Sequence, residues 1–214
     1  MRGPPGCCRR GRIPRGPGRA LRHAAGGGFK GRVSTDQLLW LTSRTAALTA
    51  FVVLLAAILT GQALRTSLLD GWVRKRAVAD LHQFLTVCWL PLVAVHVAAV
   101  TLDAVSRLSW LDVLVPFRSS YAALPIGLGT CAFDLLIVVT VTSYLRDRIS
   151  PPTWRWLHRL SYLMFALFGL HALLAGTDMA KPLVAAGFWA LLAFTVILTL
   201  ARVVVGRLAV PAAR

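Results

Sequence analysis

Five apolar segments, each long enough to cross a lipid bilayer, dominate this sequence. They cover residues of about 37–60, 81–103, 122–145, 157–175 and 182–205. A helix of roughly 20 apolar residues spans the hydrocarbon core, which is about 30 Å thick. Lipid offers no water to unpaired backbone groups, and none of the segments alternates as barrel strands do, so each is predicted to be helical. The expected fold class is an all-α, polytopic transmembrane helix bundle of about five spans.

The composition agrees with a membrane setting. Hydrophobic residues make up 57% of the 214 residues and the mean hydropathy is +0.66, beyond the balance of an ordinary soluble domain. Because the connections are short, we expect one transmembrane domain over residues 37–205, followed by a short C-terminal tail at 206–214. The predicted location is the cell membrane, plasma or inner, with membrane lipid as the surroundings of the spans.

Residues 1–32 form a basic segment with nine Lys and Arg, no acid, nine glycines and four prolines. It has too little apolar surface to fold alone, so we expect a disordered tail. Such a tail can contact anionic lipid or stay a solvated flank, and we expect no nucleic acid as a partner. It lacks the apolar segment of a signal peptide. An alternative hypothesis is an over-extended gene start, with the mature protein beginning near Val33.

Charge predicts the orientation. The connections 61–80 and 146–159 and the C-terminus hold 11 basic residues, whereas the alternate connections hold three. The positive-inside rule therefore places the first group in the cytoplasm and the start of the first helix outside. The nine basic residues of the tail argue for the opposite orientation. We give the loops more weight because they are short and lie between the spans.

Four of the five histidines lie in apolar segments, two on each of two predicted helices: His82 with His96, and His158 with His171. Ionisable side chains in hydrocarbon are costly and usually functional. Spacings of 14 and 13 residues separate the Cα atoms by roughly 20 Å along a helix. If the helices pack side by side, His82 can face His158 and His96 can face His171. We call these the inner pair and the outer pair; they form two stacked sites, as in a bis-haem membrane protein.

Other roles for intramembrane histidines are possible. A lone histidine can simply bond to a neighbouring helix. Proton relays usually have acids beside the histidines, but the chain has no Glu and one mid-span acid, Asp134. Metal transport favours carboxylates or thiols nearby, whereas Cys88 and Cys131 are single residues in separate spans. No CxxC or CxxCH occurs, so neither covalent haem nor a zinc knuckle is indicated. Non-covalent haem b remains as the expected cofactor.

Helical phase supports the 14-residue spacing better than the 13-residue spacing. At 100° per residue, 14 residues return to within about 40° of the same face, so His82 and His96 point the same way. Thirteen residues leave His158 and His171 about 140° apart. Tight winding after Pro151–Pro152 or a bend at Gly169 would absorb this mismatch. We also expect Pro91 to kink its helix.

The two histidine-bearing segments resemble the haem-binding helices of the ferric reductase-like transmembrane domain superfamily. The segments are LHQFLTVCWLPLVAVHVAAVTLD at 81–103 and WRWLHRLSYLMFALFGLHALLAGTD at 154–178. That superfamily includes the membrane cores of ferric reductases and NADPH oxidases and the haem subunit of periplasmic methionine sulfoxide reductase. The similarity covers about residues 37–205, and DVLVPFRSSY at 112–121 resembles the connection that precedes the third core helix in bacterial members.

The resemblance implies roles for individual residues. It implies that His82 and His158 ligate an inner haem, that His96 and His171 ligate an outer haem, and that electrons pass from the cytoplasm to an acceptor outside. The family places a basic residue near the outer haem, so Arg44 is expected to bind a propionate; alternatively it snorkels to the headgroups. Asp134 could pair with Arg44, accept from a hydroxyl or carry protons.

The sequence therefore predicts a membrane cytochrome b with two haems, the electron-transfer subunit of a ferric reductase-like oxidoreductase. We expect no flavin or nicotinamide domain, because few residues follow the last span and no GxGxxG occurs, and we assign no catalytic residue. The donor would be a separate cytoplasmic flavoprotein or quinol, and the outer acceptor a species such as ferric iron. Alternatives are the haem subunit of an extracytoplasmic methionine sulfoxide reductase system, a non-haem histidine-based transporter or proton channel, and a haem scaffold or sensor.

Overall fold

The computed structural model of the chain describes residues 34–64, 73–104, 106 and 108–208. Within them, five helices are long and apolar enough to cross a membrane, and no strand is present, which confirms the predicted all-α, multi-pass class. The expected disordered tail at 1–32 lies outside the described residues, as does the C-terminal tail beyond Leu208. The spanning helices are α1 (Thr35–Ala63), α2 (Lys75–Leu102), α4 (Ala123–Tyr144), α5 (Pro151–Ala175) and α6 (Pro182–Leu208).

Two helices begin earlier than their apolar segments predict. Helix α2 starts at Lys75 rather than at 81, and α5 starts at Pro151 rather than at 157. Hydropathy detects the part of a helix that lies in lipid, whereas helical hydrogen bonding continues into the charged flank. Proline is well suited to the first turn of α5 because the backbone N–H groups there have no partner within the helix.

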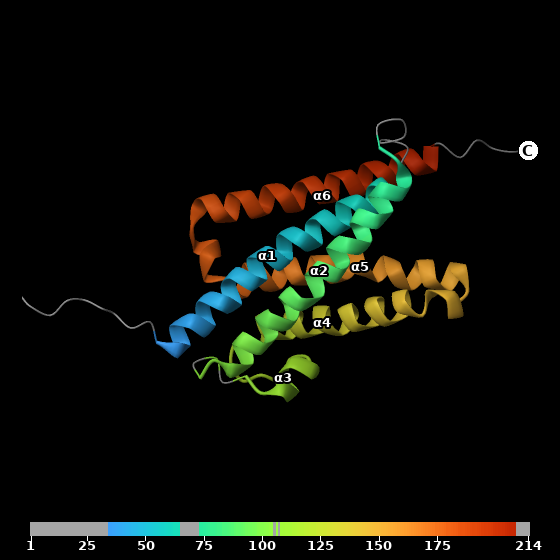
Figure 1. Ribbon diagram of the computed structural model, residues 1–214. Helices are drawn as coiled ribbons and strands as arrows, with labels where there is room; N and C mark the ends of the chain where they lie inside the picture. Colours follow the sequence, from blue (N-terminus) through green and yellow to red (C-terminus); the bar gives the residue numbers. More distant parts are fainter. Residues whose placement is uncertain (1–33, 65–72, 105, 107, 209–214) are drawn as a thin grey trace, which may run out of the picture. The chain divides into compact units, whose positions relative to one another are not determined.

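Helix α1 is the central helix of the bundle. It packs along α2, while α4 packs along α5, and α1 also contacts α5 and α6 (Figure 1). In the most apolar window of each helix, 39% of α1 is buried but only 11% of α6. Helix α6 therefore presents most of its surface to lipid. Helices α2 and α5 are not among the closely packed pairs.

Aromatic side chains pack between the α1–α2 hairpin, the α4–α5 hairpin and α6. The ring of Phe51 on α1 stacks on Phe165 of α5 and Phe188 of α6, with centroids 5.6 and 4.6 Å apart. Trp89 on α2 is 3% exposed and meets the edge of Phe168 at 5.7 Å. Lipid is as apolar as these side chains, so van der Waals packing rather than hydrophobic transfer holds the helices together. The core cluster is completed by Ala50, Leu54, Leu55, Ile58, Val93, Leu136 and Met164.

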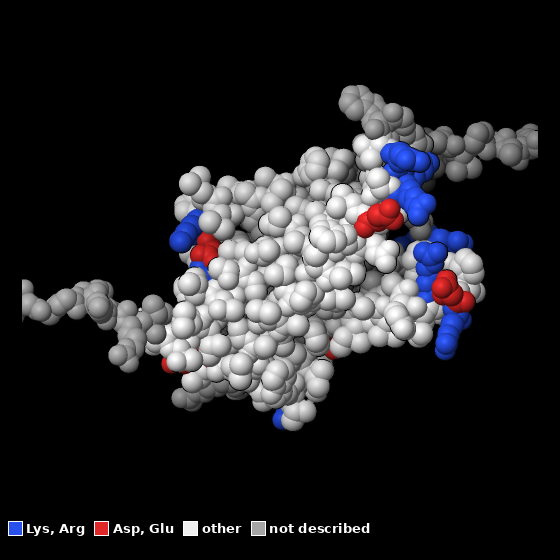
Figure 2. Space-filling view, in the orientation of Figure 1, with Lys and Arg blue, Asp and Glu red and all other residues white. Residues whose placement is uncertain are grey.

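Most charged side chains gather at the two ends of the bundle, and few lie on the face between them (Figure 2); Asp134, in the middle of α4, is an exception. The basic end holds the start of α2, with Arg74, Lys75 and Arg76, and the 3-10 turn η2 (Arg146–Arg148) between α4 and α5. The opposite end holds the start of α1 and the turn between α5 and α6 (Figure 1). Lipid excludes charge from the middle of a spanning bundle, which accounts for this distribution.

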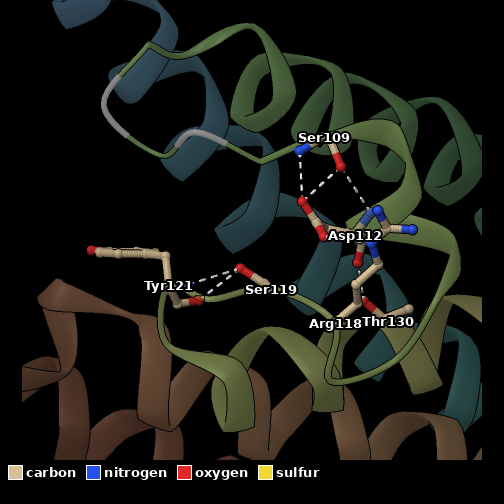
Figure 3. A network of polar contacts seen from close by, with 6 residues as sticks. All are labelled: Ser109, Asp112, Arg118, Ser119, Tyr121 and Thr130. Atoms are coloured by element: carbon tan, nitrogen blue, oxygen red, sulfur yellow. Dashed lines mark hydrogen bonds and ion pairs between the residues drawn. The ribbon is translucent and has the colours of Figure 1, made fainter.

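The connection between α2 and α4 is tied to the first turns of α4. It contains the short helix α3 (Trp110–Leu114), whose N-cap Ser109 donates its backbone N–H to the Asp112 carboxylate at 2.9 Å. The hydroxyl of Thr130 on α4 donates to the Asp112 carbonyl at 3.0 Å, and Arg118 lies 3.6 Å from the same carboxylate (Figure 3). These bonds fix the segment that follows α2 against α4.

Phe117 occupies a strained position in this connection. Its φ is 61°, in the left-handed region that bulky side chains rarely adopt. The ring lies in the space that a Cβ atom on Gly127 of α4 would need. Such strain persists only where the surroundings over-determine the conformation, and the packing of the ring on Gly127 provides that constraint.

Candidate functional site

The structure brings His82 of α2 and His158 of α5 together as the inner pair. Their ring centroids are 6.2 Å apart and their planes are 75° apart. Nδ1 of His82 lies 2.8 Å from the carbonyl oxygen of Ala57 on α1. A carbonyl can only accept, so Nδ1 is the donor in this contact, and Nε2 is the ring nitrogen left to act as a ligand.

His96 of α2 and His171 of α5 form the outer pair with nearly the same geometry. Their centroids are 6.4 Å apart and their planes are 72° apart. Nδ1 of His96 donates to the carbonyl of Ser43 on α1 at 3.0 Å, and Nδ1 of His171 donates to the carbonyl of Pro125 on α4 at 2.8 Å. Both rings therefore also have Nε2 available as a ligand.

The remaining histidine, His158, is held by a hydroxyl and an aromatic ring. Its Nδ1 lies 3.3 Å from the hydroxyl of Ser143 on α4, and the indole of Trp154 stacks on it at 5.1 Å. Thus α1 orients both histidines of α2, and α4 orients both histidines of α5. Metal-ligating histidines commonly donate their other ring nitrogen in this way, which fixes the tautomer and the ring orientation.

The separation within each pair is that of two imidazoles on one metal ion. A metal–nitrogen bond is about 2.0–2.1 Å, and the ring centroid lies roughly 1.1 Å behind the nitrogen, so two axial imidazoles have centroids about 6.3 Å apart. The observed values of 6.2 and 6.4 Å agree with this distance. The ring separation in both pairs is therefore compatible with a metal ion between the two imidazoles.

The donor set distinguishes the kind of metal centre. Among the residues that the structure describes, no group of three or more His, Cys, Asp or Glu side chains is arranged to hold an ion. A bare zinc ion takes three or four protein ligands, so two imidazoles suit it poorly. Haem iron receives its equatorial nitrogens from the porphyrin and needs only axial ligands from the chain. The two-histidine sites fit haem.

The outer pair forms although the spacing of His158 and His171 places them on different faces of α5. Helix α5 is continuous α-helix from Pro151 to Ala175, so the tight winding expected after Pro151–Pro152 is not present as a change of helix type. The bend considered at Gly169 stays a prediction. Helix α2 instead runs obliquely to the α4–α5 pair (Figure 1). Although α2 and α5 are not closely packed, the ring distances show that histidines of α2 reach both histidines of α5.

Arg44 lies beside the outer pair and has an acidic partner. It follows Ser43, which bonds His96, and its Nε donates to the Asp178 carboxylate at 2.8 Å; a second contact completes the ion pair. The guanidinium also lies 4.0 Å over the Trp40 ring. The acid that Arg44 contacts is therefore Asp178 in the 3-10 turn η3 (Thr177–Ala180), not Asp134. The binding of a propionate by Arg44 stays a prediction.

The Arg44 guanidinium, by its hydrogen bond and its charge, lowers the pKa of Asp178, with Lys181 adding a smaller effect. A carboxyl whose pKa is depressed by folding contributes stability above its unfolded pKa of about 3.9, and this contribution is lost as the pH falls through the lower folded value. Asp178→Asn is therefore expected to melt a few degrees below the wild type at pH 7 in detergent. The difference should vanish in acid, when the carboxylate is protonated.

Lys181→Gln provides the matched control. Its ammonium is 3.7 Å from the same carboxylate and its side chain is 72% exposed, so its removal should shift the melting temperature less. Equal melting of Asp178→Asn and wild type from pH 7 down to pH 3 would show that the ion pair does not stabilise the fold.

Sequence reasoning missed the groups that orient the histidines. Three of them are backbone carbonyls, those of Ala57, Ser43 and Pro125, which carry no residue-type signal. Only the packing of α1 on α2 and of α4 on α5 reveals them. Asp178 was also missed as the partner of Arg44, although its position just after the histidine-bearing helix places it at the same membrane face.

The fold and the site define a helical membrane protein with two facing pairs of half-buried histidines on two of its spanning helices. Residues 45–169 match the family described as the ferric reductase like transmembrane component. This match covers more than half of the sequence, so the chain belongs to that family. It contains His82, His96 and His158 and ends two residues before His171. Comparison with curated proteins and with solved structures gave no significant match.

Membership in this family supports a general role in electron transfer within the membrane, and such domains generally bind haem. The resemblance of the two histidine-bearing segments to ferric reductase-like helices is confirmed at the level of the family.

Proposed function

We propose that the chain is a membrane cytochrome b that carries electrons across a plasma or inner membrane by means of two b-type haems. One haem would lie between His82 and His158 and the other between His96 and His171. The observation that carries this proposal is the matched geometry of the two pairs, with centroids 6.2 and 6.4 Å apart and every Nδ1 engaged by a neighbouring helix.

The chain's own residues would position the haems and set their properties. Haem b supplies reversible one-electron chemistry at its iron when it is bound. The Nδ1–H bonds to Ala57, Ser43 and Pro125 make the imidazoles more basic ligands and fix their planes. Trp89 and Phe168 pack between the levels of the two pairs and exclude lipid and water from that region. The bundle thereby keeps two similar sites at separate depths.

The charge distribution supports a direction of transfer. The inner pair lies on the side of the basic end, which the positive-inside rule assigns to the cytoplasm. A cytoplasmic flavoprotein or membrane quinol would deliver electrons there, and an acceptor such as ferric iron would receive them at the opposite face. The same site would serve the haem subunit of an extracytoplasmic methionine sulfoxide reductase system, in which the acceptor is a partner enzyme.

The dithionite-reduced minus oxidised spectrum of the purified protein, with pyridine haemochrome quantitation, tests the proposal. We expect a sharp low-spin b-type α band and about two haems per chain, as bis-imidazole ligation at both pairs requires. A colourless protein after expression with ample haem would contradict the proposal and favour a non-haem histidine transporter or proton channel. For a haem-containing protein, reoxidation by ferric chelates or by a methionine sulfoxide reductase would distinguish the two acceptors. If neither reoxidised the red protein, it would be a scaffold or sensor.

A further inference from the structure

We propose that Gly61 and Gly129 are positioning residues that allow one histidine of each pair to reach its backbone acceptor. This inference rests on the proposed haem function of the pairs. Gly61 lies on α1 beside His82, and Gly129 lies on α4 beside His171. At each glycine the imidazole borders or occupies the space that a Cβ atom would take, closely at Gly129 and less closely at Gly61.

At the inner site, the His82 ring packs directly against α1 at Gly61. The acceptor of the His82 Nδ1–H is the Ala57 carbonyl, and in an α-helix the same carbonyl accepts from the N–H of residue 61. The imidazole must therefore approach α1 at the surface where the residue 61 side chain would stand. A Cβ atom on Gly61 would lie 3.1 Å from Cε1 and 3.5 Å from Nδ1 of His82. Favourable carbon–carbon contacts begin at about 3.5 Å, so the ring would have to shift slightly.

The outer site repeats the arrangement on α4 with less room. The acceptor of the His171 Nδ1–H is the Pro125 carbonyl, and residue 129 again lies four positions later. A Cβ atom on Gly129 would lie 2.7 Å from Nδ1 and 2.9 Å from Cε1 of His171. These separations are well inside van der Waals contact, so the His171 ring could not keep its position.

The two pairs are therefore constructed alike. In each pair the ring of one histidine packs against a glycine: His82 against Gly61, and His171 against Gly129. The same histidine donates to the carbonyl of the residue four positions before that glycine. The opposite histidine of each pair lies against a serine, with its Nδ1 3.3 Å from the Ser143 hydroxyl or 3.0 Å from the Ser43 hydroxyl. The glycines stand on different helices, α1 for the inner pair and α4 for the outer pair. Any effect of filling them should accordingly be confined to one haem.

Gly61→Ala and Gly129→Ala test the inference, with Gly187→Ala as the matched control, because nothing lies within 4 Å of a Cβ atom at that helical glycine. The measurements are haem per chain, the highest g value of each low-spin haem and the midpoint potential of each haem. Signals are assigned to the inner or outer haem with the histidine variants. Gly129→Ala should lower the outer haem several-fold and leave the inner haem unchanged. Gly61→Ala should shift the g value and potential of the inner haem while retaining it.

A second variant separates ring displacement from general misfolding. If the added methyl group of Gly129→Ala clashes with the imidazole, Gly129→Ala combined with His171→Ala should be no less stable than His171→Ala alone. Spectra of both glycine variants indistinguishable from Gly187→Ala, or equal loss of both haems in either variant, would overturn the inference. Absence of haem from the wild type would instead refute the proposed function.

Discussion

Replacing His96 or His171 with Ala is expected to remove the outer haem and to leave the inner haem in place. Haem content should fall from about two to about one per chain, because one imidazole cannot maintain bis-histidine ligation at that level of the bundle. The inner pair is braced by different groups, with Ala57 bonding His82 and Ser143 lying beside His158, so its geometry should persist. Pyridine haemochrome quantitation and redox titration of each variant provide the measurement.

The inner pair supplies the matched comparison. His82→Ala and His158→Ala should give the reciprocal loss, so each of the four variants should retain one low-spin haem. The retained signal should be the same in the two variants of one pair and different between the pairs. Unchanged haem content in His96→Ala and His171→Ala, or a retained signal that groups His82 with His96, would show that the histidines are paired incorrectly.

Trp89→Ala is expected to cause the largest loss of folding stability among single substitutions outside the histidines. The side chain is 3% exposed and packs on Phe168, and removal of a large buried aromatic side chain costs about 3 kcal/mol or more through lost contacts and a residual cavity. Lipid does not replace these contacts, because the side chain lies inside the bundle. Reversible unfolding in mixed micelles measures the free energy of unfolding.

Trp156→Ala is the control for this prediction. That side chain is 61% exposed on α5, so its removal leaves no cavity in the bundle and should change the free energy of unfolding by less than about 0.5 kcal/mol. Equal losses in the two variants would mean that Trp89 does not form part of a packed core between the two hairpins.

Much of the architecture could be predicted because membrane helices have a strong local signal. The five apolar segments became five helices, and the boundaries differed mainly where α2 and α5 extend into charged flanks at Lys75 and Pro151. The four histidines were found from their types and spacing alone. Their facing arrangement needed the assumption that the two helices lie side by side, and the 13-residue spacing argued against it; only the structure showed that both pairs of rings come together.

The sequence by itself determined the class of the protein, because lipid forces every long apolar segment to satisfy its backbone bonds as a helix and makes each intramembrane histidine stand out. Only the tertiary structure decided which groups orient those histidines and what Arg44 contacts. The acceptors are mostly carbonyls such as those of Ala57 and Pro125, which every residue possesses, and Asp178 lies 134 positions from Arg44. Interactions of this kind depend on the position of one helix against another, and local sequence does not encode that position.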